Sequence, residues 1–158
     1  MRLDRRGFVH SVSALVAAAA LAGCNDGEPD DGRPESEVRL DAYLSEHEAN
    51  LYDGSIDNRT GEDEVTVAVG AGDRGLAYDP AAARIDIGTT VVWEWTGRGG
   101  RHNVVSESGD GSDFEYYSGP ITSEEGHTWT YTFDEEGVAL YYCEAHRSVG
   151  HLGALIIG

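Results

Sequence analysis

A cysteine and two histidines stand close together near the end of the chain, where they could bind a metal ion. Cys143, His146 and His151 fall within nine residues, directly after an apolar run that favours a β-strand. Another histidine, His102, lies far upstream beside Asn103. A thiolate and two imidazoles, one of them distant in sequence, form the ligand set of electron-transfer copper sites, where a weaker axial group completes the coordination. The spacing therefore predicts a copper site that forms only when the chain folds.

Each of these residues also has an ordinary structural interpretation. A single cysteine at a strand end is often a small buried hydrophobe, and His151 could line the pocket or face solvent. The upstream His102 and the pattern around Cys143 favour a metal site. Three imidazoles and a thiolate also suit tetrahedral zinc. A redox-inert zinc site, or a module that stores or delivers copper, is therefore the alternative to electron transfer, and metal analysis with visible spectroscopy separates these functions.

The wider sequence around these residues is similar to that of the blue copper proteins. Within them it resembles the halocyanins, which are membrane-attached relatives of plastocyanin. The similarity extends from about Tyr52 to the C-terminus and includes His102-Asn103-Val104-Val105, Tyr141-Tyr142-Cys143, the Cys-x-x-His step to His146, and Gly150-x-x-Gly153-Ala154. It implies a cupredoxin-like Greek-key β-sandwich that holds a single copper ion alternating between Cu(I) and Cu(II).

The resemblance also implies roles for individual residues. His102, Cys143 and His146 correspond to the equatorial copper ligands, and Asn103 to a residue that ties the two ligand loops together near the thiolate sulfur. The family places its axial methionine five residues after the second histidine, where this chain has His151. The only methionine of the chain is its first residue, and there is no glutamine. We therefore expect His151 to be the axial ligand.

These expectations describe an electron carrier rather than an enzyme. Copper oxidases and nitrite reductases need further copper centres with additional histidines, and only His10, His47 and His127 remain unassigned. No grouping of serine, histidine and acid indicates a nucleophilic triad. The expected partners are redox proteins of the respiratory chain.

The predicted contact surface for these redox partners lies on the loop that carries the second histidine. The edge of His146 is expected to be exposed and to serve as the electron port. Val149, Gly150 and Leu152 would surround it as an apolar docking patch.

Alternating apolar residues predict the strands that must position the ligands. Residues 65–69 alternate valine with smaller or polar side chains, and Trp93 and Trp95 share one face of a later segment. Short strands at regular spacing, with no convincing core helix, favour a β-sandwich. We predict an all-β domain of seven or eight strands over 63–158, preceded by a short helix and lead-in over 38–62.

One segment of this region formally matches a nucleotide-binding pattern. Gly70-Ala71-Gly72-Asp73-Arg74-Gly75 has the form Gly-x-Gly-x-x-Gly. That pattern binds pyrophosphate only when a helix follows it within a βαβ unit. Here an extended segment ending at Pro80 follows, so we interpret the glycines as a loop and exclude nucleotide binding.

The charge of the chain excludes nucleic acid as a partner. There are 29 acidic residues against 11 basic ones, all arginine. Removing residues 1–23 takes away three arginines and one acid, which leaves 28 acids, 8 arginines and a formal charge of −20. Such a charge repels phosphate backbones. This charge is typical of a halophilic protein that stays soluble in concentrated salt. The Debye length falls to about 3 Å at 1 M salt, so repulsion between the acidic groups is screened.

The start of the chain predicts export and membrane attachment. Residues 1–23 resemble a twin-arginine lipoprotein signal, with Arg5-Arg6 before an apolar run too short to span a bilayer. The run ends in Leu-Ala-Gly before Cys24, which would become the lipidated N-terminus. The acidic, Gly- and Pro-rich segment 24–37 is predicted to be a disordered tether. The protein is therefore expected at the extracytoplasmic face of the cell membrane, anchored through Cys24.

Overall fold

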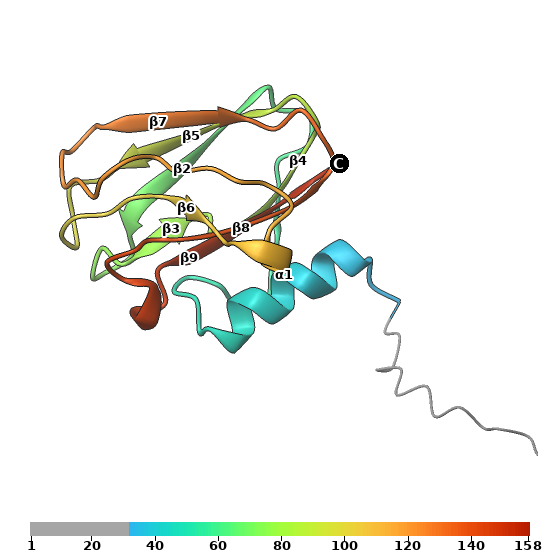
Figure 1. The fold of residues 1–158 in the computed structure, drawn as a ribbon, viewed down its shortest axis with the longest axis horizontal. Coiled ribbons are helices and arrows are strands. Elements are labelled where there is room, and N and C mark those ends of the chain that lie inside the picture. Colours follow the sequence, from blue (N-terminus) through green and yellow to red (C-terminus); the bar gives the residue numbers. More distant parts are fainter. Residues whose placement is uncertain (1–31) are drawn as a thin grey trace, which may run out of the picture. The chain divides into compact units, whose positions relative to one another are not determined.

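The computed structural model describes residues 32–158, so the predicted leader, Cys24 and most of the predicted tether lie outside the described residues. The described chain forms one α-helix and nine strands (Figure 1). The elements are α1 Glu35–Glu46, β1 Asp57–Asn58, β2 Glu64–Ala71, β3 Ala77–Asp79, β4 Ala82–Ile85, β5 Thr90–Trp95, β6 Val105–Ser106, β7 Thr128–Thr132, β8 Gly137–Tyr142 and β9 Leu152–Ile157, with short 3₁₀ helices at Gly109–Gly111 and Arg147–Val149. Within this part, no helix is long and apolar enough to cross a membrane.

The strands form two sheets that pack face to face. One sheet has the order β1-β4-β9-β8-β6 and the other the order β3-β2-β5-β7. The predicted all-β sandwich is confirmed. The described residues contain nine strands rather than seven or eight, because two-residue pairings at the edges of the larger sheet form the additional strands β1 and β6.

The predicted helix is present, with different ends. Pro34 precedes its first turn, where Glu35 and Glu37 place negative charge at the positive end of the helix dipole. The last three residues of the segment predicted as a tether are therefore helical. The helix ends at Glu46, before the left-handed residue Glu48, so the apolar Leu51 is not part of its buried face.

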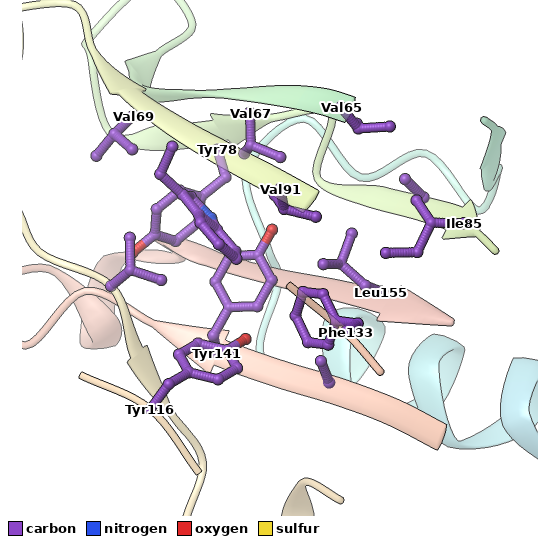
Figure 2. Packing of buried hydrophobic residues seen from close by; sticks show 14 of the residues in the cluster. Val65, Val67, Val69, Tyr78, Ile85, Val91, Tyr116, Phe133, Tyr141 and Leu155 are labelled. Carbon is purple, nitrogen blue, oxygen red and sulfur yellow. The ribbon is translucent and has the colours of Figure 1, made fainter. Parts of the chain in front are cut away.

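The inner core lies between the two sheets and is rich in aromatic side chains (Figure 2). Val65, Val67 and Val69 of β2 point into it from the smaller sheet, as their alternation predicts. The rings of Trp93 and Tyr141 meet edge to face with centroids 5.6 Å apart. Large aromatic side chains bury much apolar surface and dominate the energy of such a core, so this cluster contributes strongly to the stability of the sandwich.

The helix α1 lies against the outer face of the larger sheet (Figure 1). A second apolar cluster fills the space between them. Leu40 and Leu44 of the helix are fully buried there, and Leu140 and Ile156 from β8 and β9 belong to the same cluster. Each such side chain contributes about 1.5–3 kcal/mol when it leaves water. Because one face of β9 belongs to the inner core and the other faces α1, all six residues of this strand are buried.

Strand pairing brings the segments with the predicted ligands together. At the end of the β8–β9 pair, the Cys143 N–H donates to the His151 carbonyl at 3.0 Å, which closes residues 143–151 into a loop. We call these residues the ligand loop. On the other edge of β8, β6 pairs antiparallel and places the segment of His102 beside Cys143.

Candidate metal centre

The four residues predicted as ligands converge at one end of the sandwich. His102, Cys143, His146 and His151 each offer a donor atom, and these atoms all lie within 4.8 Å of one another. The Cys143 Sγ atom is 3.8 Å from His102 Nδ1 and 3.7 Å from His146 Nδ1, and the two Nδ1 atoms are 3.1 Å apart. A thiol and three imidazoles at this spacing can bind one metal ion.

His102 is fixed by a hydrogen bond on the side away from this centre. Its Nε2–H donates to the Arg98 carbonyl at 2.7 Å, which leaves the lone pair of Nδ1 facing Cys143. Its own carbonyl accepts the indole N–H of Trp95 at 3.0 Å. A hydrogen bond to the ring nitrogen that does not face the metal orients a metal-binding histidine and sets its tautomer.

The glycines of the Gly-x-Gly-x-x-Gly segment pack against this support. They belong to the end of β2 and the turn that follows, so the prediction of a loop without a helix is confirmed. A Cβ atom on Gly70 would lie 2.7 Å from the Arg98 carbonyl oxygen and 3.2 Å from His102 Nε2. One on Gly75 would lie 2.5 Å from the Gly99 nitrogen. The pattern therefore reflects close packing beside His102 rather than a phosphate site.

Asn103 connects the two segments that carry the ligands. Its side-chain oxygen accepts the Glu144 N–H at 3.1 Å, and its amide group donates to the Glu144 carboxylate and to the Gly119 carbonyl. The resemblance implied this bridge. The backbone N–H of Asn103, rather than its side chain, approaches the Cys143 thiol and lowers its pKa.

Burial controls the charge of the centre. It raises the pKa of the Cys143 thiol, and three neighbouring backbone N–H groups partly offset this effect. Burial lowers the pKa of His102. It also lowers the pKa of His151 to about 3, with the imidazoles of His102 and His146 acting in the same direction. The imidazoles of His102 and His151 are therefore neutral at pH 7, and a cation among them would favour the thiolate.

His151 shows how well these residues fit a metal ion. Its side chain is completely buried, and neither ring nitrogen has a hydrogen-bond partner. The Ala77 carbonyl is near enough to raise its pKa slightly, but without the geometry of a hydrogen bond. Its ring packs against Tyr78 with centroids 4.3 Å apart. An unsatisfied buried imidazole is costly, and coordination would satisfy one of its nitrogens.

His146 is the half-buried member of the cluster, whereas the other three side chains are buried. Val149 is 46% exposed beside it in the ligand loop. The predicted docking patch is otherwise wrong, because Gly150 and Leu152 are buried. Leu152 begins β9 and packs under α1 instead of facing a redox partner.

The remaining histidines of the described chain lie outside this cluster. His47 is exposed at the end of α1, where its Nδ1 contacts the Tyr43 carbonyl. His127 packs edge-on against Trp95 with centroids 4.8 Å apart. Neither completes a second metal site among the described residues.

Sequence reasoning missed two residues that hydrogen-bond to the segments carrying the predicted ligands. The Arg98 carbonyl holds His102, and only the glycine-rich composition around it indicated close packing. Asn50 hydrogen-bonds to the Val149 carbonyl in the ligand loop at 2.7 Å. No local pattern around Asn50 predicted that contact.

Comparison with known proteins agrees with this geometry. Residues 65–158 match the family described as copper binding proteins, plastocyanin/azurin family. The chain is 52% identical to halocyanin from Natronomonas pharaonis, with 98% of each chain covered, and 30% identical to pea plastocyanin over 59% of this chain and 58% of that one. It superposes on oxidised plastocyanin from Dryopteris crassirhizoma with a TM-score of 0.50 at 19% identity, covering 60% of this chain and all of the other. The chain therefore belongs to the plastocyanin/azurin family of copper-binding proteins, as a halocyanin-like cupredoxin with a single copper site.

Proposed function

We propose that this protein carries single electrons on a copper ion held by His102, Cys143 and His146, with His151 as the axial ligand. The observation that carries the proposal is that one thiol and three imidazoles converge at one point. The ring nitrogens of His151 have no hydrogen-bond partner there. Membership of a family of electron carriers that are not enzymes supports it further.

The side chains around the centre favour fast electron exchange by keeping its geometry fixed. Copper supplies the redox change, between Cu(I) and Cu(II), when it is bound. The hydrogen bond from His102 to the Arg98 carbonyl and the bridge from Asn103 to Glu144 restrain both ligand segments. A site that changes little between oxidation states has little reorganisation to overcome.

His151 should distinguish this protein from members with an axial methionine. Imidazole nitrogen is a harder donor than thioether sulfur, so it favours the Cu(II) state. We expect a lower reduction potential and a paler or greener colour than a methionine-ligated site would have.

An absorption and paramagnetic-resonance spectrum of the copper-loaded mature protein tests the proposal. A thiolate-to-copper charge-transfer band, together with reversible one-electron reduction, is the expected result. Zinc in place of copper after purification, with no visible band on copper loading, would support the redox-inert alternative. Copper that is readily lost to a chelator would instead support storage or delivery.

We also propose that export and lipidation place the protein on the extracytoplasmic face of the membrane. The twin-arginine and Leu-Ala-Gly-Cys patterns of residues 1–24 support this location. Dual acylation at Cys24 would give stable attachment, whereas a single chain would be marginal. In cells producing the full chain, Cys24→Ser should move the protein from the membrane fraction to the soluble fraction while copper binding persists. Continued membrane association of the variant would contradict the anchor.

The half-buried edge of His146 is the proposed electron port. Val149→Asp should slow electron exchange with a redox partner by placing charge in its contact surface, without removing copper. Val38→Asp is the matched control, because Val38 is similarly exposed (39%, against 46% for Val149) but lies on α1. Equal exchange rates for both variants would show that the port is elsewhere.

A further inference from the structure

A short segment outside the family match holds the ligand loop from its outer side. We call residues 48–52 the strap: they join α1 to the chain that leads into β1. The match to the plastocyanin/azurin family begins only at residue 65. We propose that the strap keeps the ligand loop in its metal-binding shape and that Asn50 is the positioning residue through which it does so. This inference rests on the proposed copper site.

Asn50 makes three hydrogen bonds to two separate segments around His151. Its backbone N–H donates to the Gly150 carbonyl at 2.8 Å, and its Nδ2 donates to the Val149 carbonyl at 2.7 Å. The same Nδ2 donates to the Leu76 carbonyl at 2.7 Å. One side chain therefore connects the ligand loop to the turn between β2 and β3.

Both of the segments that Asn50 contacts lie directly beside His151. Gly150 is its neighbour in the chain, and Leu76 precedes Ala77, whose carbonyl is close enough to the imidazole to raise its pKa. Neither ring nitrogen of His151 has a hydrogen bond that would fix the ring. Its orientation therefore depends on packing against the Tyr78 and His102 rings and on the backbone on either side of the ring. Asn50 joins those two stretches of backbone.

The backbone of the strap is closely fitted to the loop. Gly150 has a φ of +84°, and a Cβ atom there would lie 2.5 Å from the Glu48 carbonyl oxygen. Within the strap, Glu48 and Leu51 have φ values of 50° and 65°. Non-glycine residues keep this left-handed conformation only where the surrounding structure requires it. The strap is thus held in one shape against the loop.

The other end of the strap is anchored by the helix. Ala49 N–H donates to the Leu44 carbonyl, and Leu44 is fully buried in the outer cluster. Tyr43 donates its O–H to the Tyr141 carbonyl at 3.1 Å, which ties α1 to β8 two residues before Cys143. The strap therefore bridges a fixed helix and the ligand loop.

The test compares Asn50→Ala with Tyr52→Phe, which also changes the strap. Tyr52→Phe removes a hydrogen bond to Asp41 of α1 and leaves the contacts with the ligand loop intact. In metal-free protein, Asn50→Ala should speed amide hydrogen exchange of residues 146–151 by about tenfold or more. In copper-loaded protein, it should shift the reduction potential and the paramagnetic-resonance spectrum. Tyr52→Phe should change neither.

The two measurements separate positioning from simple stabilisation. Faster exchange with an unchanged potential and spectrum would overturn the proposal, because the strap would then only stabilise the fold. Unchanged exchange would overturn it as well. If Asn50→Ala fails to fold, Asn50→Ser keeps the backbone bond and a neutral polar side chain that is too short to reach both carbonyls, and the same shifts are expected. If the unaltered protein lacks a thiolate-to-copper band, the copper proposal fails, and exchange in the metal-free variants still decides whether the strap orders the loop.

Discussion

The two faces of the larger sheet are both apolar, but the inner face leads to the metal centre and the outer face packs against α1. The inner face carries aromatic side chains and ends in the buried Cys143 of the metal centre. The outer face carries aliphatic side chains covered by α1, such as Leu140 and Ile156. The inner face lies within the family match, whereas α1 precedes it. The comparison shows how a segment outside the common sandwich can contact the ligand loop from outside while the ligands remain inside.

The largest expected effect comes from the inner face. Cys143→Ser should abolish the thiolate-to-copper absorption completely, because a serine hydroxyl is not ionised at neutral pH and is a poor copper ligand. The fold should persist, since the replacement is nearly isosteric. Absorption after copper loading and thermal unfolding of the metal-free protein measure the two effects. A retained intense visible band would show that the sulfur does not bind copper.

A substitution on the outer face should lower stability and leave the copper spectrum unchanged. Leu44→Ala creates a cavity under α1 and should lower the free energy of unfolding by about 2–5 kcal/mol. The copper spectrum of the folded variant should stay the same. Urea unfolding of metal-free protein gives the stability, with the partly exposed Val38→Ala on the same helix as the control. A spectral change in Leu44→Ala would mean that the two faces are coupled more tightly than their separate packing indicates.

His151→Met sharpens the comparison within the metal centre itself. A thioether in place of the imidazole should raise the reduction potential and strengthen the blue absorption, because sulfur is the softer and weaker axial donor. Voltammetry and absorption provide the measurements, and His47→Met at the exposed end of α1 is the control. Identical spectra and potentials for His151→Met and the unaltered protein would exclude His151 from the coordination sphere.

The smallest effect concerns an ion pair that joins α1 to the loop after β6. Arg39 contacts both carboxylate oxygens of Asp113, at 2.9 and 3.1 Å, and holds the pKa of Asp113 below its usual value. This contribution to stability is complete above the ordinary carboxyl pKa near 4. It is lost as the pH falls through the lowered pKa of the folded state.

Asp113→Asn tests this pH dependence. The variant should be destabilised by about 1 kcal/mol or less at pH 7, because the pair is partly exposed and screened by salt. The difference from the unaltered protein should shrink as the pH falls below about 4. Urea unfolding at several pH values measures it, and a difference that grows on acidification would contradict the assignment.

Much of the centre could be predicted because its residues follow local rules. Alternation along β8 places Cys143 on the inner face, and the short spacing to His146 and His151 needs only one loop. His102 was recognisable from Asn103 beside it and from the family pattern. The β-sandwich itself followed from the alternating strands.

The errors and omissions come from contacts between distant segments. Leu152 was expected at the surface, although the unbroken apolar run of β9 is typical of a strand buried on both faces. The helix was predicted, but the sequence did not show that it covers the outer face of this sheet. Asn50 was not predicted for the same reason, because its partners are 26 and 99 residues away along the chain.

The hydrogen bond from the Trp95 indole to the His102 carbonyl has an optical consequence. It connects a chromophore directly to a proposed ligand residue, and the indoles of Trp93 and Trp129 form a separate tilted pair with centroids 5.2 Å apart. An open-shell ion beside an indole quenches its emission, whereas a closed-shell ion does not. The fluorescence of this protein should therefore rise when the bound ion is reduced, so that its oxidation state can be followed continuously in dilute samples too pale to measure by colour.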